Sequence, residues 1–327
     1  MALHKLALAC IGLVGATKTP WSAYLDDEAV AGATTPKLCP SPSGWHPCAC
    51  IREVESGTKT EEVQDGQSGA RLLRLHHVNG TIEDVPECPY ARPELPRNDG
   101  GGPSDPCALD WAHAAPMEVF SRHNESIVSF TANYVVPDAP KTVASNILYY
   151  WIGLQDTTSA ANPVVQPVLS FYPGSSPNNW YFESWNCCPA GHKIKGPSIP
   201  VAGPGAKLRG ALTRDGHETT INSTDGSGNS SVLVVYDSHI VTSWNWVDIT
   251  LETYSVTDCD QYSAGGAMIF EDMLILNRGG VPVTPQFASK PYIDGSYLNA
   301  TESATFTGCC NGRFDTSTWG KATMTQN

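Results

Sequence analysis

The sequence predicts an all-β protein, an antiparallel β-sandwich or jelly roll preceded by an irregular, disulfide-rich N-terminal region. From about residue 118 onward, short runs rich in Val, Ile, Thr, Tyr and Trp alternate with turn residues, and no segment shows a convincing helical period. Eight or more strands without a helix are typical of two packed sheets. The expected strands cover residues 127–136, 147–154, 164–171, 180–185, 198–201, 206–213, 218–222, 231–236, 246–254 and 267–275.

The first part of the chain, residues 1–16, is expected to be a secretory signal peptide. His4 and Lys5 supply a positive charge, and the apolar run that follows them, as far as Ala16, is too short to span a bilayer. Val14 and Gly15, together with Ala16, are the small residues that a signal peptidase needs. We therefore expect a secreted, extracellular protein.

Residues 17–115 are expected to form a Cys-, Pro- and Gly-rich N-terminal region or propeptide. Its one strand candidate, residues 70–76, precedes a turn at Asn79-Gly80 and predicts a hairpin. The Gly- and Pro-rich run near residue 100 is its natural end. Residues 116–288 then form the sandwich domain, and residues 289–327 form a disulfide-anchored tail.

Ten cysteines lie beyond the signal peptide, an even number that predicts up to five disulfides in a secreted chain. Their spacing leaves the pairing open and does not match a zinc finger. Five Asn-x-Ser/Thr sequons predict a glycoprotein. The cysteines are Cys39, Cys48, Cys50, Cys88, Cys107, Cys187, Cys188, Cys259, Cys309 and Cys310, and the sequons begin at Asn79, Asn124, Asn222, Asn229 and Asn299.

Charge and composition narrow the range of partners. The chain holds 20 Lys and Arg against 33 Asp and Glu, a net charge of −13, which is unlike a nucleic-acid-binding surface. Beyond the signal no segment is long and apolar enough to cross a membrane. No Gly-x-Ser-x-Gly elbow is present, which argues against a serine hydrolase. We expect a monomer that needs no cofactor or metal and binds neither nucleic acid nor membrane.

Three predicted strands carry polar side chains where apolar ones are expected. In residues 246–254, period-two alternation places Val247, Ile249, Leu251 and Thr253 on one face, and Trp246, Asp248, Thr250, Glu252 and Tyr254 on the other. Gln166 interrupts an apolar run, and Glu183 shares a face with Tyr181 and Trp185. Internal hydrogen bonding alone would explain any one of these residues. Together they predict a sheet with one buried face and one open face that forms a cleft.

These strands resemble those of the glutamic peptidases of the eqolisin type, in the same order and at similar spacing. Tyr150-Trp-Ile-Gly-Leu154 resembles that family's W-V-G-I segment. The Gln of VVQPV corresponds to the Gln of the family's L-Q-T-G strand, and WYFESW resembles the family's W-Y-E-W-Y strand. Val247-Asp-Ile-Thr-Leu-Glu-Thr-Tyr254 resembles A-E-W-I-V-E-D-F. The resemblance covers about residues 120–275 and implies a concanavalin-A-like sandwich whose working residues lie on a concave sheet.

The resemblance implies roles for single residues. Gln166 takes the place of the family's catalytic Gln, whose amide stabilises an oxyanion. Asp248 takes the place of the catalytic Glu, a general base that activates water. An Asp is one methylene shorter, and a shift of about 1 Å in a reacting group costs roughly a hundredfold in rate. Glu252 and Glu183 match two further acids of the cleft, and the aromatic side chains expected to bind substrate are Trp151, Tyr181, Trp185 and Trp246.

Two functions follow from this interpretation. The first is a secreted glutamic-peptidase-like hydrolase, an endopeptidase that cleaves a polypeptide substrate with activated water. The alternative is a non-catalytic, lectin-like sandwich that binds carbohydrate on aromatic platforms, among them Trp180 and Trp244. The geometry of Gln166 distinguishes the two, because catalysis requires its amide and a carboxylate to face one shared space.

Overall fold

The computed structural model shows an all-β protein built from two packed sheets, which confirms the predicted fold class. It describes residues 37–42, 44–89, 114–123, 126–159, 163–175, 179–187, 189–236, 243–264, 267–285, 288–289, 305–307, 313–315 and 320–325. The predicted signal peptide, Cys107 and the Cys309–Cys310 pair lie outside these residues. Among the described residues no helix is long and apolar enough to span a membrane.

The elements follow one another along the chain as a nearly unbroken series of strands. They are β1 (Leu38–Ser41), β2 (Gly44–Pro47), η1 (Cys48–Cys50), β3 (Ile51–Glu53), β4 (Thr58–Gln64), β5 (Arg71–His76), β6 (Ile82–Pro86), β7 (Ala114–Arg122), β8 (Ile127–Val135), β9 (Ile147–Gln155), β10 (Val164–Phe171), β11 (Trp180–Cys187), η2 (Pro189–Gly191), β12 (Lys193–Lys195), β13 (Ile199–Pro200), β14 (Lys207–Asp215), β15 (Glu218–Thr224), β16 (Ser230–Tyr236), β17 (Trp246–Tyr254), η3 (Cys259–Gln261), β18 (Met268–Asn277), β19 (Ala288–Ser289), β20 (Thr305–Thr307), β21 (Arg313–Asp315) and β22 (Ala322–Thr325).

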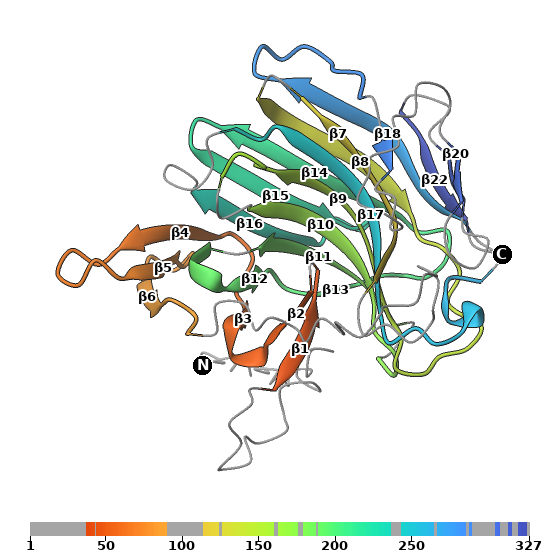
Figure 1. The fold of residues 1–327 in the computed structure, drawn as a ribbon, viewed down its shortest axis with the longest axis horizontal. Helices are drawn as coiled ribbons and strands as arrows, with labels where there is room; N and C mark the ends of the chain where they lie inside the picture. The colour runs from red at the N-terminus through yellow and green to blue at the C-terminus, as the bar shows by residue number, and fades with distance from the viewer. Residues whose placement is uncertain are drawn as a thin grey trace, which may run out of the picture.

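Two large sheets contain most of these strands (Figure 1). The first, here called the β9 sheet, has the order β19-β7-β17-β9-β10-β11-β12-β3, with β13 paired to β11. The second, the β8 sheet, has the order β20-β21-β22-β18-β8-β14-β15-β16-β4-β5-β6. Their pairs are antiparallel except for β12 with β3 and β16 with β4, which are parallel.

The core between the sheets consists of the apolar face that period-two alternation predicts. On β17, Val247, Ile249 and Leu251 are fully buried in it, and on β9 every second residue from Leu148 to Leu154 packs there as well. Burying a side chain of this size stabilises the folded state by about 1.5–3 kcal/mol. The opposite residues of the same strands therefore lie on the outer face of the β9 sheet.

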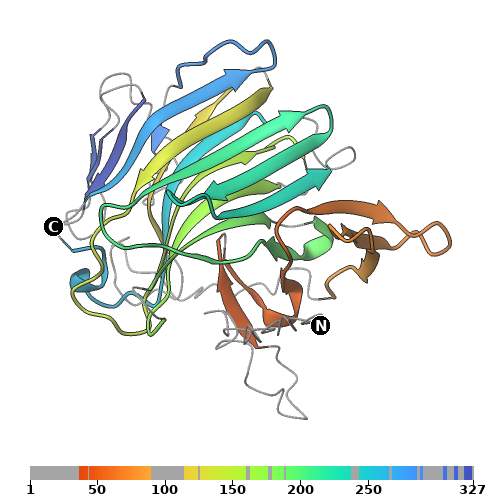
Figure 2. The same cartoon turned by 180° about the vertical axis from the view of Figure 1, so that it is seen from behind.

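The N-terminal region joins both sheets. Strand β3 adds to the edge of the β9 sheet, and β4 continues the β8 sheet, from which β4–β6 project on the side away from β20–β22 (Figures 1 and 2). The predicted hairpin around Asn79-Gly80 is confirmed as β5–β6. Two disulfides, Cys39–Cys48 and Cys50–Cys88, lie within this region, and Cys259 is also disulfide-bonded.

Candidate active site

The polar residues predicted from the sequence lie on one face of the β9 sheet. Strands β17, β9, β10 and β11 are consecutive neighbours. Their outward-facing side chains form a second buried cluster, which includes Trp151, Val168, Tyr181, Trp185 and Tyr254. The alternation along each strand places Asp248, Gln166 and Glu183 on this same face. A carboxylate and the Gln166 amide therefore share one surface instead of lying on opposite sheets.

Asp248 and Gln166 lie at the same level on strands that both neighbour β9, with Gly153 between them. Residues that lie at one level across neighbouring strands are here called a row. Asp248 pairs with Gly153 in the β17–β9 ladder. Gln166 lies between the pairs Val165↔Leu154 and Val168↔Trp151 of the β9–β10 ladder, which places it on the other side of Gly153. Two strand spacings separate their Cα atoms, about 10 Å. Because glycine has no side chain, Gly153 itself places no side-chain atom between the two polar groups.

The Gln166 amide is the strongest sign of a binding function. The residue is 0% exposed, and among the described residues neither its Oε1 nor its Nε2 has a hydrogen-bond partner. Leaving one buried polar group unpaired costs about 1–3 kcal/mol. A side chain that keeps both a donor and an acceptor unused at this cost is suited to bind a group that arrives from outside.

The two carboxylates of β17 occupy different rows. Asp248 is fully buried, and its Oδ1 accepts a hydrogen bond of 2.6 Å from the indole Nε1 of Trp246. Glu252 lies four residues beyond Asp248 on β17 and pairs with Tyr149. It accepts a hydrogen bond of 3.2 Å from Trp151 Nε1. Asp248 is therefore the carboxylate that shares a row with Gln166.

The indole of Trp151 forms the floor between Gln166 and Asp248. A Cβ atom placed on Gly153 would lie 2.6 Å from the Cζ3 atom of that ring. The ring therefore lies directly over the Gly153 backbone, and its Nε1 is anchored on Glu252. The row consequently has an aromatic base and a polar group on each side.

Gly153→Ala is expected to destabilise the protein, because the new methyl group would overlap the Trp151 ring. Overpacking of this kind costs about 1–3 kcal/mol, which urea denaturation of the purified variant would measure. Gly66→Ala is the matched control, since a Cβ atom at that position meets nothing within 4 Å. Equal midpoints for the two variants would show that the ring does not lie over Gly153.

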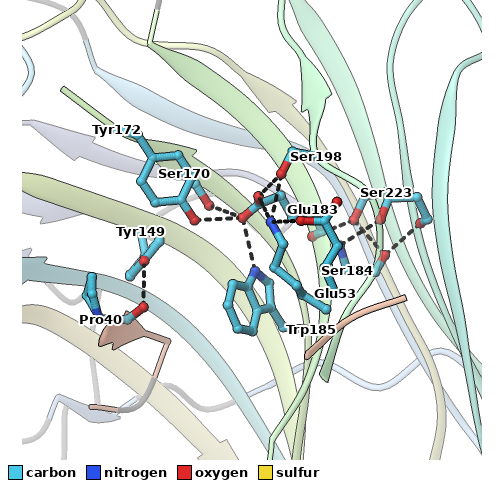
Figure 3. A network of polar contacts seen from close by, with 12 residues as sticks. Pro40, Glu53, Tyr149, Ser170, Tyr172, Glu183, Ser184, Trp185, Ser198 and Ser223 are labelled. Carbon is cyan, nitrogen blue, oxygen red and sulfur yellow. Dashed lines mark hydrogen bonds and ion pairs between the residues drawn. The ribbon is translucent and has the colours of Figure 1, made fainter. Parts of the chain in front are cut away.

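Glu183 lies in the neighbouring row and is held by a dense polar network (Figure 3). Its Oε2 accepts hydrogen bonds from Ser170, Tyr172 and Trp185, at 2.8, 2.9 and 3.1 Å. Its Oε1 accepts bonds from Lys195 at 2.6 Å and from Ser198 at 2.5 Å. Burial alone would raise the pKa of Glu183, but the Lys195 ammonium and the hydroxyl donors lower it below the usual carboxyl value.

This network makes Glu183 a buried, ionised anchor rather than a base. Five donors occupy its two oxygens, and the charge of Lys195 is compensated by Glu183 and, at 3.4 Å, by Glu53 of β3. A carboxylate with a lowered pKa and saturated oxygens accepts a proton poorly. Its position fixes β10, β11 and β12 against one another beside the Gln166 row.

The outer face is covered, whereas the sequence predicted an open cleft. The hydroxyls of Tyr149 and Tyr254 donate to the carbonyl oxygens of Pro40, at 3.4 Å, and Ser41. The Sγ of Cys187 lies 3.6 Å from the carbonyl oxygen of Pro42. Residues 40–42 thus lie across the face from β17 to β11, and the Cys39–Cys48 disulfide packs on it. The prediction failed because a segment distant in sequence folds back over the sheet.

The aromatic residues predicted to bind substrate divide into two groups. Trp151, Tyr181 and Trp185 are at most 4% exposed, and Trp246 is half-buried in the row next to that of Asp248. Trp180 and Trp244 are buried in the core between the sheets, so the suggestion that they are sugar platforms is wrong. Within the described part of the chain, no group of three or more His, Cys, Asp or Glu side chains could hold a metal ion.

Sequence reasoning missed Lys195 and the spacer glycine. Lys195 belongs to a three-residue strand in which Lys193 and Lys195 are both buried, and buried lysines require a partner. The run of alternating lysines after Glu183 was the available signal. Gly153 was part of a noted motif, but only the strand register places it between Asp248 and Gln166.

Comparison with known proteins gave similarities to solved structures alone. No protein-family model and no curated protein matches this sequence. Scytalido-glutamic peptidase with a transition state analog inhibitor aligns at TM-score 0.43 and 9% identity, over 66% of this chain and 100% of that chain. SCP-B, a member of the eqolisin family of peptidases in complex with the tripeptide Ala-Ile-His, aligns at 0.42 and 10%, over 64% and 96%. A single mutant of congerin II aligns at 0.27 and 14%, over 41% and 92%. Similarities at this level do not by themselves assign an activity.

Proposed function

We propose that this protein is a peptidase-like hydrolase in which Asp248 and Gln166 act on a peptide bond held between them. The observation that carries the proposal is the Gln166 amide, buried and without a partner among the described residues, in the same row as a buried carboxylate. Such a pair is suited to a reaction in which a bound group gains and then loses charge.

Asp248 would act as the general base and then as the general acid. Its carboxylate takes one proton from a water molecule as the water oxygen bonds to the peptide carbonyl carbon. The tetrahedral intermediate then loses its C–N bond, and the same proton passes from Asp248 to the leaving nitrogen. The Trp246 indole donates to Oδ1, which fixes the orientation of the carboxylate during both transfers.

Gln166 would stabilise the charge that develops on the carbonyl oxygen. Its Nε2 donates to that oxygen as it becomes an oxyanion, while Oε1 accepts from the attacking water. A prearranged donor in a buried site contributes more than one in water, because it needs no reorganisation when the charge appears. Within the described part of the chain no group bonds to either atom, so both are available to the substrate.

Contacts made by the outer face support a peptide as its ligand. Two tyrosine hydroxyls of the face donate to backbone carbonyl oxygens of residues 40 and 41. Such donors recognise the peptide backbone without regard to side chains. A polypeptide substrate would therefore meet these two hydroxyl donors on one side of the row once residues 40–42 move aside. The carbohydrate alternative has no comparable support.

The expected result for Gln166→Ala is a loss of about 10²–10³-fold in the cleavage rate of an acid-denatured protein such as casein. The purified full chain would be assayed at acidic pH, alongside a Cys39→Ser/Cys48→Ser form in which the covering hairpin is no longer closed by its disulfide. Gln64→Ala is the matched control, because Gln64 lies exposed on β4.

Cleavage at equal rates by the wild type and Gln166→Ala would contradict the proposal, as would an absence of cleavage from both the disulfide-closed and the opened form.

We also propose that the protein is secreted, since disulfides persist in oxidising compartments, and that it is a monomer. Sizing of the protein recovered from culture medium tests this.

A further inference from the structure

The hydrogen-bonded ladder between β9 and β10 is interrupted beside Gln166. Pairs run from Val164↔Gln155 to Val165↔Leu154, stop, and resume at Val168↔Trp151. The residue opposite Ile152 in this gap is Pro167, which has no backbone N–H to donate. Such a proline weakens a central pair of strands unless another group completes the ladder.

Tyr134 of β8 supplies that group from the opposite sheet. Its hydroxyl donates to the carbonyl oxygen of Pro167 at 2.8 Å and accepts from the backbone N–H of Ile152 at 3.1 Å. The phenol oxygen of Tyr134 therefore replaces the direct hydrogen bond from the N–H of Ile152 to the carbonyl oxygen of Pro167 that would otherwise join the strands. Burial raises the pKa of Tyr134 well above its usual value, so the phenol keeps the proton that it donates.

The surroundings of Tyr134 keep this ring in place. The ring packs edge-on against Phe182 and Phe270, with centroid distances of 4.9 and 4.8 Å. Gly210 of β14 leaves the necessary room, since a Cβ atom there would lie 2.7 Å from the Tyr134 ring and 2.8 Å from Pro167. The hydroxyl thus reaches the ladder through a space that the β8 sheet provides.

We propose that Tyr134 is a positioning residue for Gln166. By standing between Ile152 and Pro167, its hydroxyl holds β9 and β10 further apart at this point than a direct backbone bond would. Gly153 and Gln166 are the next residues on those two strands, so the separation sets where the Gln166 amide stands relative to Asp248. The inference rests on the proposed hydrolase function.

Tyr134→Phe removes only the hydroxyl and tests this role. We expect kcat for peptide cleavage to fall about 10–100-fold, because a small displacement of a reacting group is costly, while KM and the shape of the pH profile stay the same. Amide hydrogen exchange at Ile152 is expected to accelerate at the same time. Tyr150→Phe is the matched control, since its buried hydroxyl bonds to Ser263 at 2.9 Å and leaves the ladder intact.

Pro167→Ala is a second variant, in case Tyr134→Phe folds poorly. It restores a backbone donor opposite Ile152, so β9 and β10 are expected to close on each other and kcat to fall with the protein fully folded. Unchanged kcat in both variants beside an active wild type would overturn the positioning role and leave the hydrolase proposal standing. A wild type without activity would overturn both proposals. A fall in kcat that is equally large in Tyr150→Phe would show general destabilisation and overturn the positioning role of Tyr134.

Discussion

Asp248→Asn is expected to lower kcat/KM for peptide cleavage by about 10²–10⁴-fold, the largest effect of any single substitution in this protein. The amide cannot take a proton from water, so the proposed base is lost. The change is nearly isosteric, and the Oδ1 of Asn can still accept from the Trp246 indole, whose bond to Asp248 is 2.6 Å long. Steady-state kinetics on a fluorogenic peptide would measure the loss, and thermal unfolding would show that the fold is retained.

The matched test of this assignment is Glu252→Gln. Glu252 lies on the same strand and is also buried, but it pairs with Tyr149 and not with Gly153. If the deep loss follows Glu252→Gln while Asp248→Asn stays active, the base is Glu252 and the row with Gln166 is not the catalytic centre. The shorter side chain of Asp248 makes this comparison the decisive one.

The strands of the sandwich could be predicted because their side chains report the environment of each face. Residues 246–254 and 164–171 occupy the predicted ranges as β17 and β10. Val247, Ile249 and Leu251 enter the core, and Asp248 lies on the other face, as alternation requires. Local period-two patterning decides these features, and it needs no knowledge of the partner strand.

Features made by segments distant in sequence could not be predicted. The parallel pairing of β16 with β4 joins residues 175 positions apart, and no local pattern encodes it. Residues 40–42 cover the outer face through backbone carbonyls, which any sequence possesses. Tyr134 looks like an ordinary core residue of its strand. Its role depends on a proline in the facing sheet.

The buried pair of Lys195 and Glu183 has one feature that local patterning indicates and one that it does not. The pattern places a charged residue on each strand, but it does not show that the two charges pair. Glu183 was predicted as an acid of the cleft because it shares a face with Tyr181 and Trp185. The lysine that neutralises it comes from β12, the next strand of the sheet. Predicting a charge on a face is therefore easier than predicting whether that charge is available for chemistry.

Lys195→Met is expected to lower the free energy of unfolding by about 3–5 kcal/mol, the cost of leaving a buried charge without its partner. Both side chains of the pair are at most 1% exposed, so water cannot replace the lost ammonium. Guanidinium denaturation at pH 7 would measure the change. Lys195→Met/Glu183→Gln is the control, because a neutral amide keeps the side-chain volume and removes the stranded charge. It is expected to recover most of the loss.

The pH dependence of stability gives an independent check on this pair. The pKa of Glu183 is lower in the folded protein than in an unfolded chain, so its contribution is present above about pH 4.3 and is lost as the pH falls below that value. Without the ammonium of Lys195, only the hydrogen-bond donors oppose the effect of burial, and the pKa of Glu183 is expected to rise above the unfolded value. The folded variant then takes up a proton more readily than the unfolded chain, so its stability relative to wild type increases as the pH falls from 7 toward 4. Parallel curves for the wild type and Lys195→Met over this range would mean that Lys195 does not hold Glu183 ionised.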